Sequence, residues 1–147
     1  MQTTTRGIRF QSVGARILVV LGCALFLALP GFANTADQVF LKTYPLAAGG
    51  QFVLDNVNGS VHVEGWDRDE VEVRAVKTSQ NDPRDVDRVQ IEVESHPGEV
   101  DVHTRYPNGE GAEVAVEYHI HVPNRVLLGC IQTVNGSLTV RGVDGGG

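Results

Sequence analysis

The amino-acid sequence predicts an all-β fold: a β-roll or β-solenoid-like stack of short strands with Asn-Gly corners. Three observations support this prediction: a repeated stretch, alternation of apolar and polar residues in several segments, and the lack of a long helical periodicity. The repeated stretch is Val57–Asp67, which returns 77 residues later as Val134–Asp144 with seven of eleven positions identical. The alternative is an antiparallel β-sandwich of hairpins, because Asn-Gly between alternating strands is also a strong hairpin signal.

Each copy of the repeat contains a predicted structural corner. Asn and Gly both tolerate positive φ, so we expect a tight turn there, and the following Ser hydroxyl can bond nearby backbone. The single tryptophan, Trp66, is expected to close one end of the core, with an aromatic ligand platform as the alternative. The predicted corner residues are Asn58, Gly59, Ser60, Gly65 and Trp66 in the first copy and Asn135, Gly136, Ser137 and Gly142 in the second.

Residues 1–33 have the features of a signal peptide. Three arginines precede the apolar run Ile17–Leu29, and Gly31 and Ala33 supply the small residues that a signal peptidase requires. An uncleaved anchor is the alternative, but thirteen apolar residues are too few to span a bilayer, which needs about 20 in a helix. We therefore expect an exported domain at residues 34–147, located in the periplasm, on the cell surface or outside the cell.

Charge and cysteine usage limit the classes of partner. Without the leader, nine basic residues face 18 acidic ones, a net charge of about −9, which disfavours nucleic acid and anionic lipid. Val20–Cys23 loosely resembles a lipobox, which leaves a lipoprotein as a further alternative. With cleavage after Ala33, Cys130 is the remaining cysteine, and its apolar neighbours predict a buried thiol.

The expected elements follow the alternation of apolar residues along the chain. The fold begins near Val39–Leu41 and Tyr44–Leu46, and Gly49-Gly50 turns the chain into a strand. Asp82 followed by Pro83 predicts a short helix through Arg88, and residues 106–112 form a loop. The inward residues of the expected strands are Phe52 and Leu54; Val61 and Val63; Val71 and Val73; Val89, Ile91 and Val93; Val100 and Val102; and Val114, Val116, Tyr118, Ile120 and Val122.

Two histidines offer the clearest chemical alternative. His119 and His121 are two residues apart on one expected strand, so their side chains share the outward face and could bind a divalent transition metal, with Glu117 as a third ligand. A solvated polar face explains the same pattern. Ser60 and Ser137 do not lie in a nucleophile elbow, and no catalytic constellation is recognisable, so we expect no enzyme activity and no cofactor. His62, His96 and His103 show no sequence reason to converge.

Four segments carry a family resemblance: Val57–Asp67, Asp69–Lys77, Tyr118–Pro123 and Thr133–Gly142. Together they resemble the bacterial putative-adhesin domain family, a domain of unknown function with β-strand repeats in exported and envelope proteins. The resemblance implies a repeat fold and an envelope location, and it supplies no catalytic residues. Members usually continue through several more repeats, so we expect that the domain is incomplete at its C-terminus.

The sequence therefore predicts a non-catalytic exported module with an adhesin-like binding or structural role. Its outward positions, His62, Glu64, Thr139 and Arg141, would form a regular recognition surface. Expected partners are a protein or glycan of the cell envelope, or a second copy through an open β edge. Nucleic acid is not expected, and membrane contact would involve only an uncleaved leader. A metal-binding protein or metal-dependent enzyme that uses His119 and His121 is the alternative.

Overall fold

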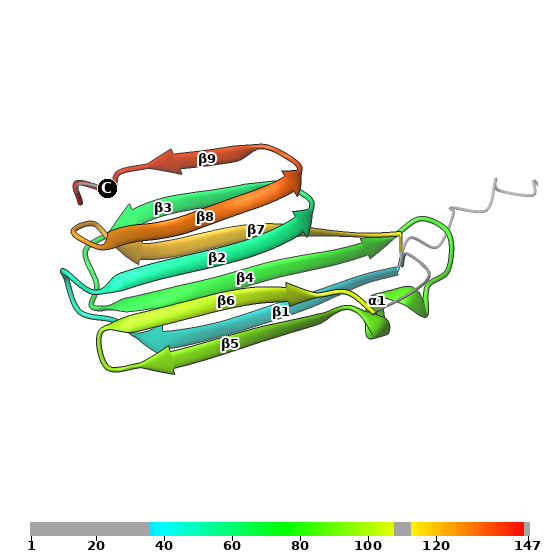
Figure 1. Cartoon of the computed structure of the whole chain (residues 1–147), viewed down its shortest axis with the longest axis horizontal. Coiled ribbons are helices and arrows are strands. Elements are labelled where there is room, and N and C mark those ends of the chain that lie inside the picture. Colours follow the sequence, from blue (N-terminus) through cyan, green and yellow to red (C-terminus); the bar gives the residue numbers. More distant parts are fainter. Residues whose placement is uncertain (1–35, 108–112, 146–147) are drawn as a thin grey trace, which may run out of the picture. The chain divides into compact units, whose positions relative to one another are not determined.

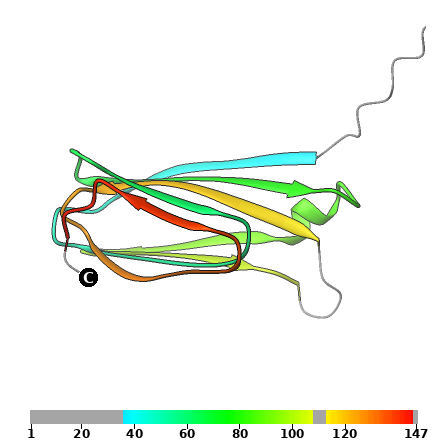
Figure 2. The same cartoon turned by 90° about the horizontal axis from the view of Figure 1, so that it is seen from above.

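The structure, a computed structural model, describes residues 36–107 and 113–145. Within these residues, nine strands form two β-sheets that lie face to face, and a single-turn helix follows β4 in the chain (Figures 1 and 2). The prediction of an all-β class is confirmed. The elements are β1 (Ala36–Pro45), β2 (Gln51–Asn58), β3 (Val61–Trp66), β4 (Glu70–Ser79), α1 (Asp85–Arg88), β5 (Gln90–His96), β6 (Glu99–Arg105), β7 (Val114–Pro123), β8 (Leu127–Asn135) and β9 (Leu138–Arg141).

The predicted signal peptide, residues 1–33, and most of the predicted loop at residues 106–112 lie outside the described residues. In the part of the chain that is described, no helix has the length and apolar character needed to cross a membrane.

Both sheets are mixed. Sheet A has the strand order β1-β4-β7-β3-β9, and sheet B has the order β5-β6-β2-β8. The pairs β2–β6, β2–β8, β3–β7 and β3–β9 are parallel, whereas β1–β4, β4–β7 and β5–β6 are antiparallel. This mixture confirms neither the complete solenoid nor the antiparallel sandwich that the sequence suggested.

The two copies of the repeat lie side by side. We call Gln51–Trp66 the β2–β3 segment and Leu127–Arg141 the β8–β9 segment. In each, an Asn-Gly pair carries the chain from sheet B to sheet A, because β2 and β8 belong to one sheet and β3 and β9 to the other (Figure 1). The segments run in parallel, and Asn58 lies opposite Asn135. Residues 77 apart in sequence are therefore neighbours in space.

Alternation places the core between the sheets. In β7 every second residue is buried, including Val116, Tyr118 and Ile120, whereas His119 and His121 lie on the outward face, as predicted. Phe52 and Leu54 of β2 face the buried residues of β7 from sheet B and are themselves fully buried. Because successive strand side chains point to opposite faces, one face of each sheet is apolar and the other is free for polar side chains.

A buried polar network supports the first Asn-Gly corner. Asn56 on β2 is fully buried, and its Nδ2 atom donates to the carbonyl oxygens of Asn58 (3.3 Å), Gly59 (3.2 Å) and Val116 (3.0 Å). Thr104 Oγ1 donates to Asn56 Oδ1 at 3.0 Å and lies 2.8 Å from the Tyr118 hydroxyl. Burial raises the pKa of Tyr118 far above its usual range. The network ties β2, β6 and β7 together beneath the corner.

The start of the expected helix differs from the prediction, whereas its end at Arg88 agrees with it. Asp82 does not cap a helix that begins at Pro83; its Oδ1 atom instead accepts the backbone N–H of Arg84 at 2.9 Å, and α1 follows at Asp85–Arg88. The hydrogen bonds from Arg84 hold the pKa of Asp82 at about 2. Beside α1, Lys77 of β4 donates to the carbonyl oxygen of Val86, which attaches the helix to sheet A.

Cys130 is exposed, so the prediction of a buried thiol is wrong. The cause is a register shift in the β2–β8 pair. Leu128 lies opposite Phe52 and Ile131 lies opposite Leu54, so β8 has one residue more than β2 in this interval. The irregularity allows Leu128 and Ile131 to pack against the core while Cys130 points outward.

Candidate binding face on sheet A

The outward side of sheet A carries two rows of polar side chains. The parallel register of β3 and β7 places His62 opposite His119 and Glu64 opposite His121. β4 and β9 continue the rows on either side, because alternation turns the same set of positions outward in each strand. The first row is Arg74, His119, His62 and Thr139, and the second row is Glu72, His121, Glu64 and Arg141.

Two imidazoles stack in the first row. The ring centroids of His62 and His119 are 5.1 Å apart, and the ring planes make an angle of 19°. Glu117, two residues before His119 on the same face, approaches both rings: its Oε1 atom lies 2.9 Å from His119 Nε2 and 4.0 Å from His62 Nε2. One exposed carboxylate thus faces two imidazole nitrogens.

The imidazole of the second row stacks on the tryptophan. The ring centroids of His121 and Trp66 are 5.0 Å apart, with an angle of 17° between the planes. The guanidinium carbon of Arg68 lies 4.7 Å from the Trp66 ring centroid, and the indole N–H donates to the carbonyl oxygen of Glu70 at 2.8 Å. Trp66 is therefore held by contacts on the sheet surface and is not a free stacking platform.

Two carboxylates flank His121. Its Nε2 atom lies 3.9 Å from Glu64 Oε2, and its buried Nδ1 atom lies 3.3 Å from Glu72 Oε1 without the geometry of a hydrogen bond. His121 thus lies between the carboxylates of Glu64 on β3 and Glu72 on β4 and stacks on Trp66.

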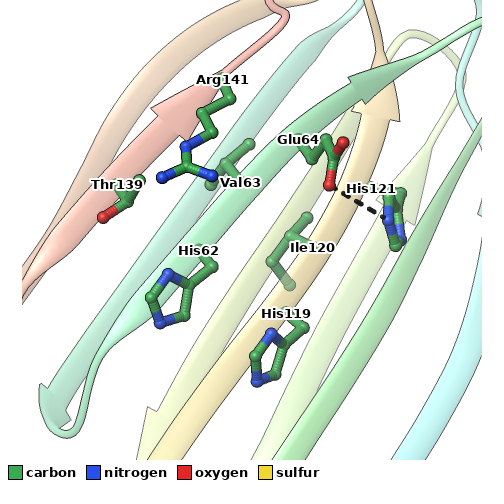
Figure 3. A pocket seen from close by; sticks show the side chains of 8 residues that line it. All are labelled: His62, Val63, Glu64, His119, Ile120, His121, Thr139 and Arg141. Atoms are coloured by element: carbon green, nitrogen blue, oxygen red, sulfur yellow. Dashed lines mark ion pairs between the residues drawn. The ribbon is translucent and has the colours of Figure 1, made fainter.

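A depression of about 320 Å³ lies over these rows (Figure 3). Three neighbouring strands, β3, β7 and β9, contribute to it, so both copies of the repeat take part. Val63 and Ile120 lie at its base and are buried in the core, so the exposed side chains that line it belong to polar residues. The lining residues are His62, Val63, Glu64, His119, Ile120, His121, Thr139 and Arg141.

The lining offers hydrogen-bond donors and acceptors close together. Arg141 donates, Glu64 accepts, and each imidazole does both. Among the described residues, no three His, Cys, Asp or Glu side chains are placed so that they could hold a metal ion. His119 and His121 share the outward face, but they belong to different stacks.

The predicted corner residues contact one another across the two copies. Asn135 Nδ2 donates to Asn58 Oδ1 at 2.8 Å, and Ser137 Oγ donates to Ser60 Oγ at 3.1 Å. The serine hydroxyls were expected to bond backbone groups, but each repeat instead uses its serine for the other repeat. The identical residues of the repeat therefore form a ladder of like side chains.

The corner glycines have different roles. Gly59 has a φ of 115°, as predicted for a turn residue, but Gly136 does not have positive φ, and neither does Asn58 or Asn135. A Cβ atom on Gly136 would collide with the carbonyl oxygen of Gly59. Glycine is needed at position 136 because the two copies approach closely. The prediction that a positive φ requires glycine there is wrong.

Two predictions about side chains on this face need correction. Trp66 lies on the outward face and does not close the end of the core. For His62 no convergence with another histidine was predicted, yet it stacks on His119 because β3 pairs with β7. Nothing in the local pattern shows this pairing, since 57 residues separate the two histidines. Asn56 was also missed, although a polar residue at an inward position after Phe52 and Leu54 was the available signal.

Comparisons with known proteins identify no family. No protein-family model matches the chain, and no curated protein matches it. One solved structure is similar, a putative cell adhesion protein from Clostridium sporogenes, with 11% sequence identity and a TM-score of 0.38. The match covers 73% of this chain and 58% of that protein. This similarity is too low to carry an argument about function.

Proposed function

We propose that the protein is an exported, non-catalytic binding module of the cell envelope, and that the depression on sheet A binds a glycan. The observation that carries the proposal is the convergence of outward side chains from both repeats and from β7 on one polar depression. In this proposal the two Asn-Gly units act as two rungs of a β-roll that hold the face in register, and the leader directs export.

The chemistry of the lining favours a hydroxyl-rich ligand over a protein. Protein interfaces are anchored by exposed aromatic and apolar side chains at their centre. Here Trp66 is engaged by His121 and Arg68, and the apolar residues of the depression are buried. Alternating donors and acceptors suit the vicinal hydroxyls of a sugar, which donate and accept at once.

A glycan microarray probed with the exported protein tests this function. The variant His62→Ala/Arg141→Ala removes two lining side chains that are not part of the core, so we expect loss of binding with unchanged thermal stability. The matched control is His103→Ala/Arg105→Ala, which removes the same residue types from the outward face of β6 in sheet B and should bind like wild type.

Three outcomes would contradict the proposal. The first is an array with no ligand, and the second is a ligand that both double variants bind equally well. The third is zinc or copper bound in stoichiometric amount and lost in His119→Ala/His121→Ala, which would favour the metal-binding alternative.

A further inference from the structure

The β8–β9 segment forms an edge of both sheets at once. In the described residues, β8 pairs with β2 alone and β9 pairs with β3 alone, and each stands last in its sheet (Figure 1). The same end of the molecule therefore presents two strand edges, one from each sheet, separated by the thickness of the core. A strand edge is a template for further pairing.

The inward side chains at this end are only half covered. Leu138 is 46% exposed and Val140 is 42% exposed, whereas their equivalents in the first repeat, Val61 and Val63, are 0% and 2% exposed. The alternation directs all four toward the space between the sheets. The core is thus unfinished on the side of β9, which leaves apolar surface to be covered.

The free backbone groups can be assigned. The carbonyl oxygen of Asn135 accepts the N–H of Gly59, and that of Ser137 accepts the N–H of Val61, so both bond to the β2–β3 segment. Consecutive residues of a strand direct their backbone groups to opposite sides. The N–H and C=O groups of Val134, Leu138 and Val140 consequently point away from the first repeat.

This edge also lacks the charges that protect the others. The outer strand at the far end of sheet B, β5, exposes Glu92 and Glu94, and the outer strand of sheet A, β1, exposes Asp37 and Lys42. β8 contains no charged residue, and Arg141 is the single charge of β9. Charged side chains on edge strands oppose pairing, so the β8–β9 edge, which has the fewest charges, opposes it least.

We infer that this edge binds a second copy of the protein. Its occupant must offer two strand edges at the separation of sheets A and B, which a single added strand does not do. The β8–β9 segment of a second copy meets this requirement, because it presents the same two strand edges at the same separation. A two-fold axis perpendicular to the sheets pairs β8 with β8 and β9 with β9 in antiparallel fashion, and it closes one continuous core over Leu138 and Val140 of both copies. β9 also contributes Thr139 and Arg141 to the glycan-binding face, but these side chains lie on the outward side of sheet A, whereas pairing would use the backbone edge and the inward Leu138 and Val140.

Neutrality of the edge also favours a second copy. Without the predicted leader, the net charge of about −9 makes the protein repel its own copies through most of its surface. Contact through β8 and β9 keeps the acidic strands of the two copies apart, because β5 and β6 lie on the other side of β2.

Sedimentation velocity of the exported protein over a wide concentration range tests the inference, with a dimer expected at high concentration. Val140→Lys places a charge in the core that the two copies would close together, and it should raise the dissociation constant about tenfold or more. The matched control is Leu41→Lys, an exposed apolar residue on β1 at the opposite edge of sheet A, which should leave the dimer intact.

A second variant avoids any loss of packing. Val134 is 72% exposed, and its N–H points to the free edge, so Val134→Pro removes a donor used in pairing and no donor used within the protomer. It should also weaken the dimer. A wild type that stays monomeric at every concentration overturns the inference, as does a dimer weakened equally by Leu41→Lys, or one that both β8–β9 variants leave unchanged. Glycan binding by these variants is measured in parallel and should not change.

Discussion

The two copies of the repeat share seven of eleven residues but lie in two different environments. Val63 and Val140 are equivalent residues, yet the first is 2% exposed and the second 42% exposed. The first repeat lies between β7 and β9 in sheet A, whereas the second has a neighbour on one side in the described structure. Neighbouring strands, rather than the repeat itself, therefore decide how much each copy is buried.

The polar contacts are unequal as well. Asn135 and Ser137 of the second copy donate their side-chain hydrogen bonds to Asn58 and Ser60 of the first. Beneath the first copy, Asn56 fixes the corner through three carbonyl oxygens. If this comparison is right, the same substitution should cost more in the first copy than in the second. The stability measurements below use dilute, monomeric protein, so that pairing of the β8–β9 edge does not contribute.

The largest difference is expected for the corner glycines. Gly59→Ala combines a φ of 115° with a collision between the new Cβ and the carbonyl oxygen of Val116, which lies on the internal strand β7. We expect a loss of about 3 to 4 kcal/mol in the free energy of unfolding. Gly136→Ala involves a collision but no positive φ, and the edge segment can move away, so a loss of about 1 to 2 kcal/mol is expected. Urea denaturation measures both; equal losses would show that the corners are equivalent.

The next difference concerns the polar residue beneath each corner. Asn56→Ala removes the buried amide that donates to three carbonyl oxygens and accepts from the Thr104 hydroxyl, which should cost about 3 kcal/mol. Thr133 lies opposite Asn56 and donates one hydrogen bond, to the carbonyl oxygen of Gly59 at 2.8 Å. Thr133→Ala should therefore cost about 1 kcal/mol. A Thr133 variant as unstable as the Asn56 variant would mean that the network does not support the first corner specifically.

The valines provide a matched pair with no polar contribution. Val63→Ala creates a cavity in a closed part of the core and should cost about 2 kcal/mol. Val140→Ala should cost less than about 1 kcal/mol, since the side chain is already half exposed. At concentrations that favour the proposed dimer, the cost of Val140→Ala should rise toward that of Val63→Ala. Costs that are equal in dilute protein would contradict the difference in burial.

These pairs also show what the sequence could predict. Alternation in β7 correctly placed Tyr118 inward and His119 outward, because it depends on neighbours along the chain. The contact between His62 and His119 depends on which distant strands pair, and no local pattern carries that information. The outward position of Cys130 depends on a register shift against β2, which is equally invisible in the sequence.

The candidate site was predicted in part for the same reason. His62, Glu64, Thr139 and Arg141 were identified as outward positions of the repeat, and all four line the depression. Their meeting with His119 and His121 follows from insertion of β7 beside β3. The parallel stacking of the repeats was accessible because seven identical residues mark equivalent positions, whereas the position of β7 has no such marker.

The smallest expected effect concerns Tyr118, which lies beneath the first corner. Tyr118→Phe removes the hydroxyl that contacts Thr104 and should cost about 1 kcal/mol at neutral pH. Burial raises the pKa of Tyr118 in the folded state, so above pH of about 10 the unfolded chain releases this proton while the folded protein keeps it. Stability is therefore fully present below that pH and falls as the pH rises, because the unfolded state then binds fewer protons. The fall should be shallower in the variant.

Tyr44→Phe is the matched control for this titration. Burial also raises the pKa of Tyr44, but it lies on β1, away from the corner. Tyr44→Phe should also make the alkaline fall in stability shallower, but it should leave stability at neutral pH nearly unchanged. Denaturation of both variants between neutral pH and pH of about 11 separates the two contributions. An alkaline fall as steep in Tyr118→Phe as in wild type would show that burial does not keep this hydroxyl protonated in the folded protein.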